Sequence, residues 1–281
     1  MAVDEPSVLQ ANLEGVGLLA ADTFDADLLV RVLTENPAMK GLLWTAEPLQ
    51  RSLRYVQDMP QISNICGRAN FDSPPRAREL LMVARRLLEP QMPTETFVDF
   101  LDWGFTGFEE RVASTVQRDA TVARVHRFVT RLGASNRVGE MLGEVAHELL
   151  MNAMFDAPIN EHGAPKYAAD RKARLTLMDA EQPTFRIASD GSRLVLQVID
   201  PFGGLQRKHV FHGLLRALGR GELDSSHGGA GLGLAMCHNA TVALFFDVLP
   251  RKRTTITGIF DLDLSLREFR SRAKSLHFFA G

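Results

Sequence analysis

The first ninety residues alternate between short apolar runs and longer segments whose apolar residues recur at helical spacing. The short runs predict buried strands, and they span 15–21, 41–46 and 61–67. The longer segments predict helices with prolines at or near their ends, and they span 24–37, 48–60 and 74–90. This order of strand and helix favours a parallel sheet with helices packed on it.

The middle of the chain changes character after Pro90. Residues 91–106 have no clear period, and we assign 94–106 as a linker. Segment 107–115 has mixed polarity and predicts an edge strand. A helix ending at Gly133 follows, and a second helix begins at Ser135 or Asn136 and stops before Pro158.

The last third of the chain contains a strong hairpin signal. Two alternating runs over 183–200 flank Asp190-Gly191, a favoured tight-turn pair. A basic, glycine-rich stretch over 203–231 predicts a flexible segment. A helix and two strands then follow, at 232–244, 245–250 and 254–264.

These elements predict two α/β domains. We expect a first domain over 1–93 with a flavodoxin-like order, and a second domain over 107–265 with helices over a mixed sheet. Residues 266–281 form a basic, amphipathic tail, for which a frayed terminus is the expected state.

Composition and charge limit the expected partners and the expected cellular location. The formal net charge of −2 gives no reason to expect a nucleic-acid partner or an anionic membrane. No apolar run approaches the roughly 18 residues of a membrane span, and the acidic N-terminus does not resemble a secretory signal. The two cysteines, Cys66 and Cys237, are too few for a disulfide framework or a zinc site. We therefore expect a cytoplasmic protein.

Three patches carry candidate chemistry. Glu148 and Asn152 lie one turn apart in the helix before Pro158. Asp200 ends a strand and is followed by Gly203 and Gly204. The third patch is the glycine-rich HGGAGLGL, which opens a helix; its site candidates are Gly228, Gly229, Gly231, Leu232 and Gly233. Glycines of this kind leave backbone N–H groups free to meet phosphate oxygens at a helix N-terminus.

The order of these three patches resembles the GHKL (histidine kinase-like, Bergerat-fold) ATPase superfamily. The resemblance covers roughly 107–265, and it implies that the second domain is an α/β sandwich that binds ATP and Mg²⁺. By this resemblance Asn152 would hold Mg²⁺, Glu148 would act on the nucleophile that attacks the γ-phosphate, and Asp200 would accept a hydrogen bond from adenine. Gly204 would let the backbone approach the base, and Thr255 would support Asp200.

The first glycine box departs from the superfamily pattern. The superfamily has D-x-G-x-G, whereas this chain reads Asp200-Pro201-Phe202-Gly203-Gly204. Phe202 would either stack near the base or narrow the pocket. Residues 205–227 would form the mobile lid over the nucleotide. Its basic side chains, which include Arg207, would either meet phosphates or, for most of them, be solvated.

The expected activity depends on which branch of the superfamily the chain resembles, the histidine kinases or the anti-sigma-factor serine kinases. Only one helix of the kind that forms the dimerising hairpin of a histidine kinase precedes the Glu/Asn helix, and His126 lacks the acidic neighbour of a phosphoacceptor. The layout is similar to the anti-sigma-factor serine kinase type, which implies phosphoryl transfer to Ser or Thr of a partner protein in a bacterial signalling pathway. The alternative is an inactive ATP-binding adaptor. Oligomeric state is left open, a homodimer included.

The first domain is similar to a degenerate receiver. Asp22 and Asp25 follow its first strand, but no Asp ends the third strand, where the phosphorylated residue of a receiver lies. This similarity implies a role in protein contacts, and a simple α/β docking domain is the alternative.

Overall fold

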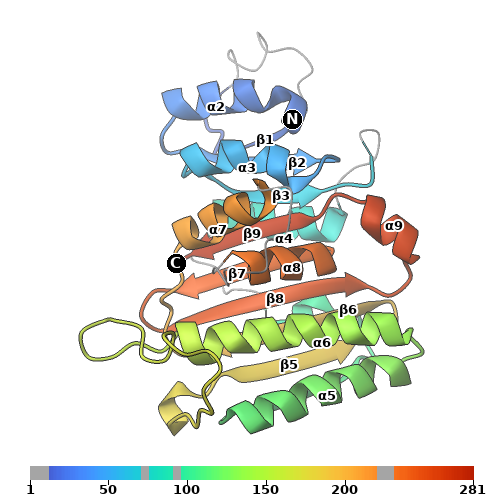
Figure 1. The fold of residues 1–281 in the computed structure, drawn as a ribbon. Helices are drawn as coiled ribbons and strands as arrows, with labels where there is room; N and C mark the ends of the chain where they lie inside the picture. Colours follow the sequence, from blue (N-terminus) through green and yellow to red (C-terminus); the bar gives the residue numbers. More distant parts are fainter. Residues whose placement is uncertain (1–12, 71–75, 91–95, 220–230) are drawn as a thin grey trace.

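A computed structural model of the protein describes residues 13–70, 76–90, 96–219 and 231–281. Across these residues, nine strands form one mixed sheet with helices on both faces, so the chain is α/β (Figure 1). The strand order is β1-β2-β3-β9-β7-β8-β6-β5-β4. The sheet therefore runs without a break through the segments expected to form two domains.

The first three strands are parallel, as the sequence predicts. They are β1 (Leu18–Asp22), β2 (Lys40–Thr45) and β3 (Ile62–Gly67). The helices that connect them are α2 (Ala26–Glu35) and α3 (Leu49–Asp58). Both helices bury apolar stripes in the same core, because Leu29, Leu33, Leu53 and Val56 are fully or almost fully buried.

The strands at the other end of the sheet pair antiparallel. Its strands are β4 (Thr106–Arg111), β5 (Thr184–Ser189), β6 (Arg193–Asp200), β8 (Arg253–Asp261) and β7 (Ala243–Leu249). The hairpin expected around Asp190-Gly191 is confirmed, with Gly191 at a φ of 98°. β4 is the edge strand, also as expected.

The C-terminal tail is not frayed, and this corrects the expectation from sequence. After α9 (Leu266–Ser271), residues Ser275–Ala280 form β9, which pairs with β3 on one side and β7 on the other. Consecutive residues from Ser275 to Phe278 are buried because a central strand is covered on both faces. β9 thus joins the parallel and antiparallel parts of the sheet.

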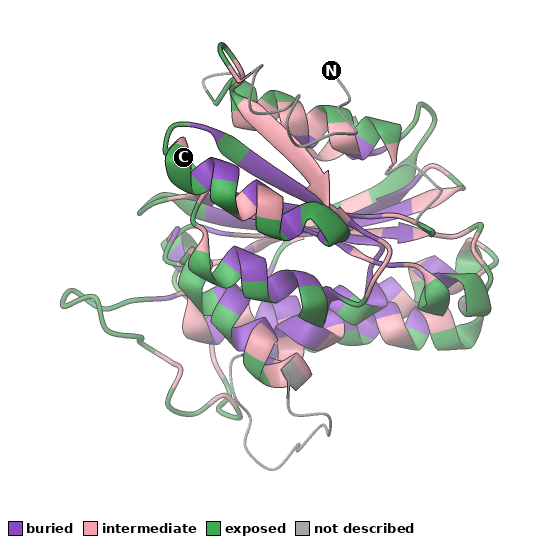
Figure 2. Cartoon of the chain, turned by 90° about the horizontal axis from the view of Figure 1, so that it is seen from above, coloured by how far each residue is buried: buried purple, intermediate pink, exposed green. Residues whose placement is uncertain are grey.

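Most helices cover one face of the sheet, which Figure 1 shows towards the viewer. They include α5 (Thr115–Arg131), α6 (Asn136–Met151), α7 (Arg207–Gly219) and α8 (Leu232–Ala240). α4 (Ala77–Leu88) and the short helix η2 (Phe97–Phe100) cover the other face, together with Leu101. Figure 2 shows buried residues concentrated in the strands and on the inner sides of the helices. None of the helices in the described ranges has the length and apolar composition needed to cross a bilayer.

The segment expected to be a flexible lid contains a packed helix. Val210, Phe211 and Leu214 of α7 are buried, and the helix lies against α3 and α8. Arg207, expected to be solvated or to meet phosphate, instead donates hydrogen bonds to backbone oxygens of Met59 and Ile62 at 3.0 and 2.8 Å. Residues 220–227 of the expected lid lie outside the described residues.

Candidate functional site

Helix α6 carries the first two candidate residues. Ser135 caps it, accepting a hydrogen bond from the Val138 backbone N–H at 3.4 Å. Its buried side, including Val145 and Leu149, packs into the core, whereas the Glu148 side chain is 23% exposed. Glu144, one turn earlier, is exposed.

The helix continues into a π-helical turn, η3 (Asn152–Asp156), that begins at the second candidate residue. Such turns are rare and are frequent at functional sites. η3 packs against β6, the strand that ends at Asp200. The turn also adds a third polar side chain, Asp156, to the row formed by Glu148 and Asn152.

Arg171, which sequence reasoning missed, binds all three of these side chains. Its Nη2 donates to Asn152 Oδ1 at 3.0 Å and lies 3.6 Å from both Glu148 Oε1 and Asp156 Oδ2. Burial raises the pKa of Asp156, and the Arg171 charge only partly opposes this shift. No periodic signal could have placed Arg171 here, because it comes from the long irregular loop between η3 and β5.

The donor set at this point suits a hard cation. Two carboxylates and one carboxamide oxygen converge on the Arg171 guanidinium, and oxygen atoms of these types are the ligands that Mg²⁺ prefers. The residues therefore fit the expected metal, on the condition that Arg171 moves away from Asn152. In this structure the guanidinium provides the positive charge.

The start of α8 lies directly against Glu148. A Cβ atom on Gly233 would lie 1.9 Å from Glu148 Oε1, so only glycine permits this approach. Gly231, the N-cap of α8, provides no side-chain cap, and its own Cβ position would lie 2.1 Å from the Gly213 backbone oxygen in α7. The second glycine box is thus packed between α6 and α7.

The remaining members of that box are placed as follows. Leu232 is half-buried at the first position of α8. Gly228 and Gly229 lie outside the described residues. The N-terminus of α8 carries the positive end of the helix dipole, and the first N–H groups of a helix have no partner within the helix itself.

Asp200 lies on the same face of the sheet as α6 and α8. It is 7% exposed. Every second residue before it on β6, namely Val198, Leu196 and Leu194, points to the same face and belongs to the core under these helices. Asp200 Oδ1 accepts hydrogen bonds from the Phe202 and Gly203 backbone N–H groups at 2.9 and 3.3 Å. Burial raises the pKa of Asp200, and these two hydrogen bonds only partly offset the effect. Oδ1 of Asp200 thus stabilises the turn formed by residues 200–203.

The threonine suggested as support for Asp200 is displaced by one residue. Thr255 pairs with Ile199 and Asp247, so its side chain lies on the opposite face of the sheet from Asp200. Thr254 lies directly across from Asp200, and its buried side chain acts with the turn N–H groups to lower the pKa of that carboxylate against the effect of burial. Thr254, and not Thr255, is therefore the threonine that lies beside Asp200. A shift of one residue reverses the face, which a sequence pattern of three consecutive polar positions cannot resolve.

The two glycines after Phe202 differ in whether a side chain would fit at their positions. Gly203 has a φ of 63°, and a Cβ there would lie 2.1 Å from the Leu249 backbone oxygen. Gly204, the glycine matched to the superfamily, is exposed and has no atom within 4 Å of its Cβ position. Phe202 between Asp200 and these glycines is half-buried.

This difference gives a paired prediction. Gly203→Ala should lower the free energy of unfolding by about 1–3 kcal/mol, because the clash is with backbone and the φ is strained for an L residue. Gly204→Ala should change it by less than about 0.5 kcal/mol. Chemical denaturation of both variants checks the pair, and equal stabilities would contradict the turn geometry described above.

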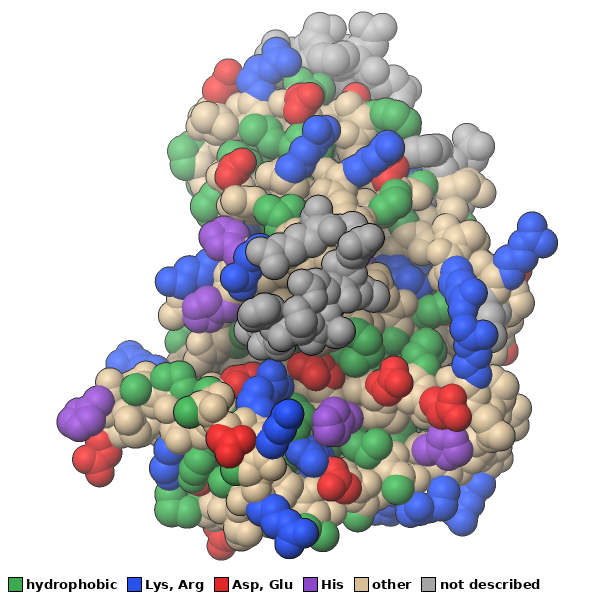
Figure 3. All heavy atoms as spheres, viewed as in Figure 1, with side chains coloured by type: hydrophobic (Ala, Val, Ile, Leu, Met, Phe, Trp, Pro, Cys, Tyr) green, Lys and Arg blue, Asp and Glu red, His purple; other side chains and the backbone are tan. Residues whose placement is uncertain are grey.

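Figure 3 shows side chains of both charge signs mixed over α5 and α6 on the helical face that carries these residues. The structure brings Glu148, Asn152, Gly231 and Gly233 together, and it places Asp200 on the same face. It does not bring Thr255 to this face.

Comparison with known proteins adds little to this geometry. No family model matches the chain, and a search of curated proteins finds no match. Among solved structures, one match is to a chain in the crystal structure of the SiaB-SiaC complex from Pseudomonas aeruginosa, with 12% sequence identity and a TM-score of 0.34. This match covers 66% of this chain and 100% of that chain. A TM-score this low does not establish a shared fold.

Proposed function

We propose that this protein is a Mg-ATP-binding signalling regulator of the GHKL type that transfers the γ-phosphate to a Ser or Thr hydroxyl of a partner protein. The observation that carries the proposal is the contact between Glu148 and Gly233, because it sets a candidate base at the N-terminus of a glycine-capped helix. Asn152 lies one turn beyond Glu148, and Asp200 lies on the same face of the sheet. These are the positions that the resemblance assigns to base, metal ligand and adenine acceptor.

Each side chain then has a definite task. Glu148 accepts the proton of the attacking hydroxyl at a carboxylate oxygen. The N–H groups in the first turn of α8 donate to phosphate oxygens, and an oxygen of Asp200 accepts from the adenine amino group. Asn152 Oδ1 would hold Mg²⁺, which, when bound with ATP, offsets the charge of the triphosphate.

Arg171 has a double role in this proposal. Without nucleotide it offsets part of the charge of Glu148 and Asp156 and donates a hydrogen bond to Asn152. When Asn152 binds the metal, the guanidinium is released and can pair with a phosphate oxygen, a partner whose geometry suits it. The site would thus exchange one cation for another.

A second candidate function is a non-catalytic adaptor. The bond between Arg171 and Asn152 favours it, since the oxygen expected to bind metal is already taken. Phe202 in the first glycine box favours it as well. Such a protein would bind ATP as a structural ligand, or none, and act by contact with its partner.

A phosphotransfer assay separates these functions. The protein is incubated with γ-labelled ATP and a bacterial lysate, and labelled proteins are treated with acid and base. Acid-stable label on a second protein supports the kinase. Acid-labile label on the chain itself would indicate a histidine kinase, and no label on any protein while ATP binds would support the adaptor.

A further inference from the structure

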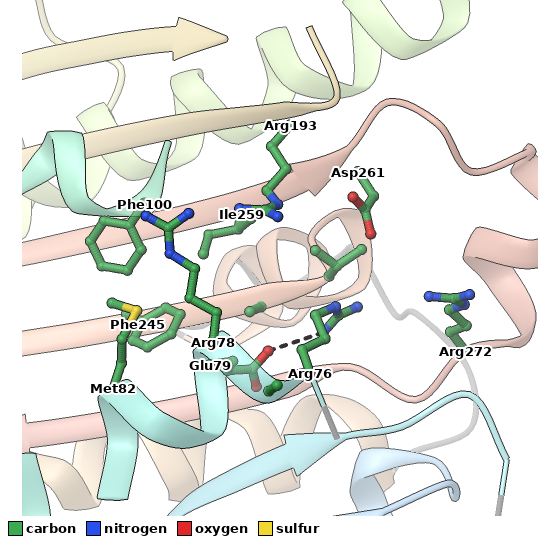
Figure 4. A pocket seen from close by; sticks show the side chains of 13 residues that line it. Arg76, Arg78, Glu79, Met82, Phe100, Arg193, Phe245, Ile259, Asp261 and Arg272 are labelled. Carbon is green, nitrogen blue, oxygen red and sulfur yellow. Dashed lines mark hydrogen bonds and ion pairs between the residues drawn. The ribbon is translucent and has the colours of Figure 1, made fainter. Parts of the chain in front are cut away.

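A cavity of about 320 Å³ lies on the opposite face of the sheet from the site described above. Its lining comes from four parts of the chain that are far apart in sequence. They are the start of α4, η2, the strands β6, β7 and β8, and the segment after α9 (Figure 4). Its volume is at the lower end of the range for small-molecule sites, which begins at about 300 Å³.

One side of this cavity is apolar. Met82 from α4, Phe100 from η2, and Phe245 and Ile259 from the sheet line it. The Phe100 and Phe245 rings lie 5.3 Å apart in an edge-to-face arrangement, with an interplanar angle of 63°. This side offers a flat ring or an aliphatic group a surface to pack on.

The other side is strongly basic. The lining includes Arg76, Arg78, Arg193 and Arg272 against Glu79 and Asp261, so positive charges exceed negative ones by two. Figure 4 shows Arg78 and Arg193 reaching over Phe100 and Ile259, while Arg76, Asp261 and Arg272 lie at the other end. Arginines crowded together in this way repel one another unless an anion lies between them.

Two of the arginines are already engaged. Arg76 pairs with Glu79 Oε2 at 3.1 Å, and Arg78 pairs with Asp102 at 2.8 Å and donates to backbone oxygens of η2 and Leu101. Arg193 has a longer and weaker contact with Asp102, at 4.0 Å. Arg272 makes no ion pair with any residue in the described ranges. Arg193 and Arg272 are therefore the cations with most capacity for a ligand.

Glu79 is fixed and does not compete for them. Its Oε1 lies 3.0 Å from His277 Nε2, and the other nitrogen of that ring lies 3.2 Å from Asn64 Oδ1. Burial alone would raise the pKa of Glu79, but the hydrogen bond and charge of His277, together with Arg76, hold it below its ordinary value. The carboxylate therefore stays ionised and anchors α4 and β9 at the floor of the cavity.

We infer that this cavity binds a small phosphomonoester that carries an apolar ring. The dianionic phosphate matches Arg193 and Arg272, the two arginines with most capacity for a ligand, and arginine pairs with phosphate through two parallel hydrogen bonds. The ring packs on Phe100, Phe245 and Ile259. This site is separate from the proposed ATP site, because the sheet lies between them.

The test is calorimetric titration of the full chain with phenyl phosphate, with inorganic phosphate and phenol as comparison ligands. We expect saturable binding of phenyl phosphate, weaker binding of inorganic phosphate and none of phenol. Arg193→Gln with Arg272→Gln should weaken phenyl phosphate at least about tenfold, the loss expected for hydrogen bonds to a charged group. The control is Arg31→Gln, an exposed change on α2 that should leave the affinity unchanged.

Several outcomes would overturn the inference. They are no saturable binding of phenyl phosphate, equal binding of inorganic phosphate, or unchanged affinity in the double variant. If the double variant does not fold, Arg272→Gln alone gives the same decision, because that side chain has no ion pair to lose among the described residues. Competition with ATP distinguishes the two sites: phenyl phosphate that ATP displaces would belong to the other face.

Discussion

Glu148→Gln is expected to reduce phosphoryl transfer about 10²- to 10⁴-fold while ATP affinity stays nearly constant. Glutamine keeps the shape that fits against Gly233, but it cannot accept the proton of the attacking hydroxyl. Initial rates of transfer from γ-labelled ATP measure the loss, and calorimetry measures the affinity.

Glu144→Gln is the matched control for this change. Glu144 lies one turn earlier on α6 and is exposed, so its neutralisation should leave the rate within about twofold. Equal rates for wild type and Glu148→Gln would remove Glu148 from the reaction and favour the adaptor.

Asn152→Ala should remove the Mg-dependent part of ATP binding and leave the fold intact. The variant lacks Oδ1, the oxygen proposed to hold the metal, and the loss of one contact to a charged partner corresponds to about a 10- to 150-fold weaker affinity. Arg171 keeps its two carboxylate neighbours, Glu148 and Asp156, so the local charge balance survives.

Asn136→Ala, an exposed change at the first position of the same helix, is the control for Asn152→Ala. Thermal unfolding of both variants verifies that the fold is kept. An Mg-dependent affinity unchanged by Asn152→Ala would rule out the metal role of that residue.

Much of the fold follows from local pattern. The first three strands, the hairpin at Asp190-Gly191, the N-cap at Ser135 and strand β4 each follow from a short stretch of neighbouring residues. Turn chemistry, capping and side-chain alternation act locally, so a sequence pattern is sufficient to predict them.

The errors arise where distant segments decide the structure. β9 is a central strand because β3 and β7 take both of its edges, and the basic stretch before it resembles a solvated tail. α7 is a helix because Val210, Phe211 and Leu214 find a core against α3 and α8. A sequence pattern over neighbouring residues does not include the strands that pair with β9 or the helices that pack on α7.

In the candidate site, too, the local sequence predicts some positions, and contacts between distant segments set the others. Glu148 and Asn152 are one helical turn apart, so their common face follows from spacing. Arg171 reaches them from a loop, and Thr254 replaces Thr255 because of strand register, which is set by pairing with β6. Neither feature is visible in the local sequence.

The central claim is that Glu148 and Asn152 face a nucleotide, and the most direct test is calorimetric titration of the full chain with ATP, with and without Mg²⁺. We predict saturable binding that strengthens when Mg²⁺ is present, because Asn152 exchanges the Arg171 guanidinium for the metal. No binding at millimolar ATP would contradict the claim, and it would mean that Phe202 and Arg171 close the site to nucleotide.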